Sequence, residues 1–138
     1  MSIENTKSAL IKAFTDAALF DPVLAVAWEN VAFVPPVGTP WAAVTFVPTQ
    51  PTVATLGDGG SDMQMGFLQI DLNYPPNDST KAQDDMIESL RAIYKAGTTF
   101  VYGGQVATIR SCGRSQGRVI NNYYKVSVTI MFWAHINR

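Results

Sequence analysis

The stretch YYKVSVTIMFWA (residues 123–134) decides the fold of this chain. Every second residue from Tyr124 to Ala134 is apolar, and polar residues such as Lys125 and Ser127 alternate with them as far as Thr129. Successive side chains of a β-strand point to opposite faces, so this pattern predicts a long strand with one buried face.

Two earlier stretches show the same alternation. GFLQIDLNYP (66–75) belongs to a predicted strand from Met63 to Tyr74, in which Gln69, Asp71 and Asn73 form the wet face. A further strand is predicted from Trp41 to Val47. The predicted sheet core contains Phe46, Leu68, Ile70, Val126, Val128 and Ile130.

Two helices flank these strands. The first is predicted from a Ser2 cap to about Leu19, where Asp21-Pro22 ends it. The second begins with a capping box formed by Thr80 and Gln83. Its predicted apolar stripe contains Ala82, Met86, Leu90 and Ile93, and Gly97 is the expected stop.

The connections are rich in glycine, proline and polar residues. A short strand is expected within 23–34, followed by a turn-rich segment at 35–40. Residues 98–110 predict a hairpin with a tight turn at Gly103-Gly104. Residues 48–62 and 111–122 are expected to be long, mobile loops. The element order predicts an α+β fold: a single mixed or antiparallel sheet with two helices packed on one face, in one domain spanning 1–138.

Charge is scarce and unevenly distributed. Hydrophobic residues make up 47% of the chain and charged residues 15%, with a net charge of −1. Residues 1–80 hold 2 Lys or Arg against 8 Asp or Glu, whereas residues 81–138 hold 8 against 3. This balance does not favour a general affinity for nucleic acid or membrane, but it could set an acidic patch against a basic patch of a neighbouring copy. Chance scatter over a solvated surface is the alternative interpretation.

The sequence offers little catalytic chemistry. Cys112 is the single cysteine, so no internal disulfide is possible, and His135 is the single histidine. Together they could form a nucleophile and base, although no motif supports the pair. Asp58 and Asp62, in the GDGGSD segment, lack the spacing of an EF-hand loop, which leaves cation binding there open. We expect no cofactor and no membrane-spanning helix, because no apolar run approaches about 18 residues.

Several segments together resemble the tail terminator family of long-tailed, lambda-like bacteriophages. They are the N-terminal helix, AWEN (27–30), the Pro-Pro motif, VTFVP (44–48), GFLQIDLNYP, the Gly-Gly hairpin and the closing strand. The resemblance covers almost the whole chain and includes no catalytic residue. It implies a structural virion protein that forms a ring, commonly of six copies, at the head-proximal end of the tail tube. Such a ring stops tube growth and offers a surface for head joining.

The resemblance also implies partners and a location. The partners are other copies of the chain, the major tail tube protein and the head–tail connector or neck protein. Assembly would take place in the host cytoplasm, and the genome would pass through the ring without specific recognition. The candidate interface residues are Asp58 and Asp62 on one side and Arg110, Arg114 and Arg118 on the other. Two alternatives remain open: another neck or tail-completion ring protein, and a small hydrolase that uses Cys112 and His135.

Overall fold

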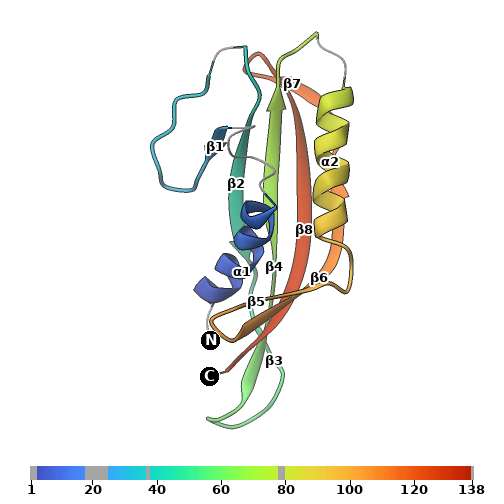
Figure 1. Cartoon of the computed structure of the whole chain (residues 1–138). Helices are drawn as coiled ribbons and strands as arrows, with labels where there is room; N and C mark the ends of the chain where they lie inside the picture. Colours follow the sequence, from blue (N-terminus) through green and yellow to red (C-terminus); the bar gives the residue numbers. More distant parts are fainter. Residues whose placement is uncertain (1–2, 18–24, 37, 78–79, 138) are drawn as a thin grey trace.

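The computed structural model describes residues 3–17, 25–36, 38–77 and 80–137. It contains two helices and one large mixed sheet, so the fold is α+β and dominated by strands (Figure 1). The elements in chain order are α1 (Ile3–Asp16), β1 (Ala25–Ala27), β2 (Trp41–Pro48), β3 (Thr52–Val53), β4 (Ser61–Tyr74), α2 (Lys81–Ile93), β5 (Thr99–Tyr102), β6 (Gln105–Arg114), β7 (Arg118–Ile120) and β8 (Tyr123–Asn137). The strand order is β1-β2-β4-β8-β6-β5, with β3 beside β4 and β7 beside β8.

The long strands β4 and β8 form the centre of the sheet. They pair antiparallel without interruption from Ser61↔Asn137 to Tyr74↔Tyr124. On one face, here called the inner face, Leu68, Ile70 and Val128 are fully buried, as the alternation predicts. All six predicted core residues are buried. The parallel pairing of β1 with β2 makes the sheet mixed.

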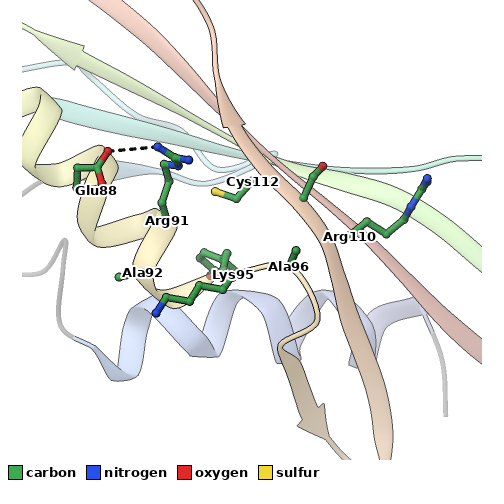
Figure 2. Close-up of a pocket in the computed structure, with 9 residues that line it drawn as sticks. Glu88, Arg91, Ala92, Lys95, Ala96, Arg110 and Cys112 are labelled. Carbon is green, nitrogen blue, oxygen red and sulfur yellow. Dashed lines mark hydrogen bonds and ion pairs between the residues drawn. The ribbon is translucent and has the colours of Figure 1, made fainter.

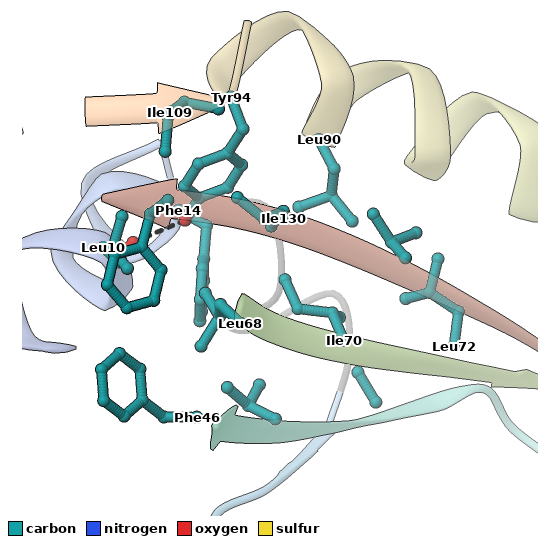
Figure 3. Close-up of a cluster of buried hydrophobic side chains, with 14 of the residues drawn as sticks. Leu10, Phe14, Phe46, Leu68, Ile70, Leu72, Leu90, Tyr94, Ile109 and Ile130 are labelled. Carbon is teal, nitrogen blue, oxygen red and sulfur yellow. Dashed lines mark hydrogen bonds between the residues drawn. The ribbon is translucent and has the colours of Figure 1, made fainter. Parts of the chain in front are cut away.

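One buried cluster joins the inner face to both helices (Figure 3). Leu10 and Phe14 enter it from α1, and Ile87 and Leu90 enter it from α2. Tyr94 is fully buried in it, and its hydroxyl donates a 2.5 Å hydrogen bond to the carbonyl of Leu10. Burial raises the Tyr94 pKa well above its usual range, because the charged phenolate is poorly solvated there. The hydrogen bond from Tyr94 to Leu10 links the end of α2 to α1.

The start of α2 differs from the prediction. Thr80 precedes the helix but makes no side-chain capping hydrogen bond. Gln83 is buried instead, and its amide donates to the carbonyls of Leu72 and Tyr124 at 3.0 and 3.1 Å. Carbonyls at the ends of β4 and β8 need partners when buried, and they attract this side chain away from the cap.

The apolar stripe of α2 is confirmed at Leu90 and differs from the prediction at Ala82. Its buried apolar residues are Ile87 and Leu90, whereas Ala82 is exposed. Met86 and Ile93 are partly buried against the core. At the other helix, α1 ends at Asp16 rather than Leu19, and the expected Ser2 cap and Asp21-Pro22 stop lie outside the described residues.

The two expected long loops prove to contain strands. β3 pairs with the start of β4, so most of 48–62 is a hairpin. β6 continues to Arg114, and β7, which begins at Arg118, pairs with β8. The loop between β6 and β7 is therefore reduced to residues 115–117. These short strands lie at exposed positions, where polar residues are tolerated and no alternation is needed. The Gly103-Gly104 hairpin is confirmed, with positive φ at both residues, as a type I′ turn requires.

The predicted wet face of β4 is only partly wet. Asp71 and Asn73 are 9% and 5% exposed. The Asp71 carboxylate accepts hydrogen bonds from Gln69 and Ser127, and Lys125 lies 3.8 Å from it. Polar neighbours therefore satisfy a carboxylate that the alternation alone would place in water.

Candidate assembly surfaces

The outer face of the sheet, opposite the buried cluster, changes character along its length. Beside Lys125, Ser127 and Thr129 it is polar, whereas Met131 and Trp133 further along β8 are apolar. An apolar belt covers this end of the outer face. Its members are Val47, Met63, Met65, Phe67, Val101, Val106, Met131 and Trp133.

The belt residues come from five strands. Met65 pairs with Trp133 and Phe67 with Met131, while Val101 faces Val106 across the β5–β6 hairpin. Val101, Val106 and Met131 are 59%, 44% and 39% exposed. Exposed apolar residues gathered on one face of a sheet are typical of interaction sites. Sequence reasoning did not identify the belt, although the switch from polar to apolar outer positions at Met131 was a visible signal.

A β-bulge in β6 decides where its basic residues point. Ile109 pairs with Phe132 and Ser111 with Met131, so Arg110 is the extra residue. After the bulge, Cys112 and Arg114 lie on the inner face, where strict alternation would have placed Ser111 and Gly113. Arg114 consequently reaches α2 and forms a 2.8 Å ion pair with Asp84. One of the three candidate arginines therefore already has a partner within the chain.

A cationic groove lies between the end of α2 and β6 (Figure 2). Its volume is about 560 Å³, and it is lined by Glu88, Arg91, Ala92, Tyr94, Lys95, Ala96, Arg110, Ser111 and Cys112. Arg91 forms a 3.4 Å ion pair with Glu88, whereas Lys95 and Arg110 have no partner among the described residues. Cys112 points from β6 toward α2, and Arg110 extends from the opposite side of β6. Burial raises the Cys112 pKa, and the nearby Arg91 charge offsets part of that rise.

The acidic candidates belong to the β3–β4 hairpin. Its tip is ordered by a hydrogen bond from Gly60 N to Gly57 O and another from Ser61 N to the Thr55 hydroxyl. Asp58 is exposed at this tip, and its side chain has no partner among the described residues. Asp62 is half-buried in β4, opposite Ile136. Leu56, beside the tip, is 89% exposed.

The acidic and basic candidates lie toward opposite ends of the sheet. Asp62 pairs with Ile136, near the end of β8, whereas Arg118 pairs with Lys125, near its start. Eleven residues of β8 separate these two levels, which is roughly 36 Å at the rise of an extended strand. The hairpin tip and β7 also lie at opposite ends of the molecule in Figure 1. The structure therefore does not bring Asp58 and Asp62 together with Arg118 within one chain.

The structure does not assemble the hypothetical Cys–His pair. Cys112 pairs with Ile130 on the inner face, while His135 is five residues further along β8 on the outer face. Its ring packs edge-on against Trp133 at 5.2 Å. A hydrolytic pair needs hydrogen-bond contact, which this arrangement does not supply. Within the described ranges, no three His, Cys, Asp or Glu side chains converge on a potential metal site, and no helix has the length and apolarity to cross a membrane.

Comparison with solved structures finds the same fold elsewhere. A solved protein that carries no descriptive name aligns with a TM-score of 0.78 at 21% identity, covering 99% of this chain and 97% of its own. A chain from the virion of a native gene transfer agent particle aligns with a TM-score of 0.53 at 14% identity, covering 95% of this chain and 93% of its own. Comparison with curated proteins finds no match.

The sequence family places this chain among the structural proteins of phage tails. The model of the phage tail terminator protein family matches residues 5–132. The chain therefore belongs to the phage tail terminator family, which confirms the resemblance seen in its sequence.

Proposed function

We propose that the chain forms a closed ring of six copies that caps the head-proximal end of the tail tube and stops its polymerisation. The observation that carries this proposal is the difference between the two edges of the sheet. The β2 side bears the acidic β3–β4 hairpin, and the β6 side bears the cationic groove and the β5–β6 hairpin. Subunits that meet through two different patches associate head to tail, and they form a ring when the rotation closes.

The family membership supports the rest of the assignment. The whole chain, 1–138, acts as one domain and needs no cofactor or catalysis. Its partners are the tail tube protein on one side of the ring and the connector or neck protein of the head on the other. The ring is assembled in the host cytoplasm and remains in the virion, with the genome passing through its centre.

Apolar contact must supply most of the association free energy. An exposed ion pair is worth at most about 1 kcal/mol, so Asp58, Asp62, Arg110 and Arg118 mainly set register and salt sensitivity. The apolar belt offers the larger contribution, because burying apolar surface yields roughly 25 cal/mol per Å². We therefore expect the free chain to be monomeric in dilute solution and to close into a ring on a tube end.

Deleting the gene tests this function. Electron microscopy of lysates should show tails that exceed the normal length and fail to join heads, and expression of the intact chain should restore both properties. Tails of normal length that lack heads would favour a neck or tail-completion ring instead. Normal tails joined to heads would refute both assignments.

A further inference from the structure

We propose that Glu29 guards the free edge of β2 and prevents a strand of a second copy from pairing with it. The Glu29 carboxylate occupies the backbone donor of Phe46, which such a strand would need. Glu29 belongs to the AWEN segment (27–30), to which the proposed ring assigns no role. The inference goes beyond the proposed function, because it concerns the free chain and holds whether or not the chain caps a tube.

The outer side of β2 is only partly covered by another strand. β1 pairs with Trp41–Ala43, whereas β2 continues to Pro48, and no other strand among the described residues lies on this side of β2. Thr49 donates its backbone N–H to the Met65 carbonyl of β4. Because backbone groups alternate in direction along a strand, those of Phe46 and Pro48 point away from β4. An uncovered edge of this kind is a template for pairing with another chain.

Two features close this part of the edge. The backbone N–H of Phe46 donates a 2.5 Å hydrogen bond to Glu29 Oε1. A hydrogen bond to a carboxylate is stronger than one to the neutral carbonyl that an incoming strand would offer. At Pro48 the ring nitrogen has no hydrogen to donate. Charged side chains and prolines protect edge strands in this way. Contacts through side chains at the same edge remain available for ring assembly.

A short turn holds the carboxylate in place. Val31 donates its backbone N–H to the Trp28 carbonyl at 3.3 Å, and Asn30 has a φ of 56°, which asparagine tolerates. The Trp28 ring stacks on Phe14 of α1, with centroids 6.1 Å apart, and Phe14 belongs to the buried cluster. The segment that follows β1 lies along the outside of β2 (Figure 1). The core therefore positions Glu29, which lowers the entropic cost of its hydrogen bond.

Removing the carboxylate tests the guard. In Glu29→Ala the Phe46 donor is free, so the self-association constant from analytical ultracentrifugation should rise about tenfold or more. Glu29→Gln keeps an acceptor oxygen and should remain closer to the parent than to Glu29→Ala. Glu88→Ala removes the same charge from the exposed face of α2 and should leave self-association unchanged. Circular dichroism establishes that each variant is folded.

Amide hydrogen exchange gives a second readout at the edge itself. In the dilute parent the Phe46 amide should exchange slowly, and in dilute Glu29→Ala it should exchange faster. Concentrating that variant should restore protection as strands pair. Pro48→Thr keeps Glu29 and adds a donor to the same edge, so it should also raise self-association. This variant tests the edge even if Glu29→Ala does not fold.

Three results would overturn the guard. The first is a folded Glu29→Ala variant that associates no more than the parent. The second is equal association of Glu29→Gln and Glu29→Ala, which would assign the effect to charge rather than to the hydrogen bond. The third is unchanged protection of the Phe46 amide in Glu29→Ala. None of these results alters tail length after gene deletion, so failure of the guard and failure of the proposed function are distinguishable.

Discussion

The two faces of the β4–β8 pair follow different physical requirements. On the inner face, Leu68, Val128 and Ile130 are fully buried in one cluster with both helices. On the outer face, a polar half around Asp71 is satisfied within the chain, while Val101, Val106 and Met131 of the apolar belt remain exposed. The inner face therefore holds the monomer together, and the outer face and the sheet edges are available for assembly. Substitutions that separate stability from assembly test this division.

The largest effect is expected from a charge placed on the inner face. Val128→Asp would bury an unpaired carboxylate, at a cost of several kcal/mol, and should unfold the chain. Met131→Asp puts the same side chain on the outer face, where water can solvate it, and should remain folded. Thermal unfolding followed by circular dichroism measures both. Equal melting temperatures for Val128→Asp and the parent would contradict the strand assignment.

A smaller loss of stability is expected from the hydroxyl that joins the helices. Tyr94→Phe removes the hydrogen bond that the hydroxyl donates to the Leu10 carbonyl, which should cost about 1 kcal/mol in urea unfolding. If the substitution lowers the free energy of unfolding by less than about 0.5 kcal/mol, the hydrogen bond contributes little to stability.

The same residue gives the protein an alkaline limit. The Tyr94 pKa is raised in the folded state, so the buried neutral phenol contributes to the free energy of unfolding. This contribution is fully present below the pKa of an unfolded tyrosine, about 10, and is lost as the pH rises above that value. Stability of the parent should therefore fall above about pH 10. The decline should be shallower in Tyr94→Phe, which has no phenol to ionise. Identical slopes would remove Tyr94 from the explanation.

Arginine reversals should have small effects on stability that depend on the partner. Arg114→Glu breaks the ion pair with Asp84 and should lower the free energy of unfolding by about 1 kcal/mol. Arg118 has no side-chain partner among the described residues, so Arg118→Glu should lower it by less. The double variant should stay folded by circular dichroism and give tails of uncontrolled length if this end of the molecule contacts another ring. Normal tail lengths would remove both residues from the mechanism.

The smallest effect on stability should come from the apolar belt. The double variant Val101→Ser, Val106→Ser alters two exposed side chains, so the free energy of unfolding should change by less than about 1 kcal/mol in total. Capping of tubes should nevertheless fail, because the lost apolar surface no longer stabilises the assembly. Normal capping by the folded double variant would exclude this part of the belt from the interface.

The candidate site was less accessible to sequence reasoning than the core. Asp58, Asp62, Arg110 and Arg118 were identified as charged surface residues, but their positions along the sheet were not. Arg114 was expected at an interface, yet the bulge after Ile109 turns it toward Asp84. The groove between α2 and β6, which Lys95 helps to line, became visible only in the structure.

The sequence by itself determined the three long strands, their buried faces, the glycine hairpin and the family. The strands, their buried faces and the hairpin depend on local periodicity and turn chemistry, which neighbouring residues specify directly, whereas the family came from a resemblance of several segments. Tertiary structure alone decided the pairing of β3 and β7, the bulge in β6 and the burial of Gln83 and Asp71. Each of these depends on which strand edge, carbonyl or cation lies nearby in space, and residues distant in the chain supply those neighbours.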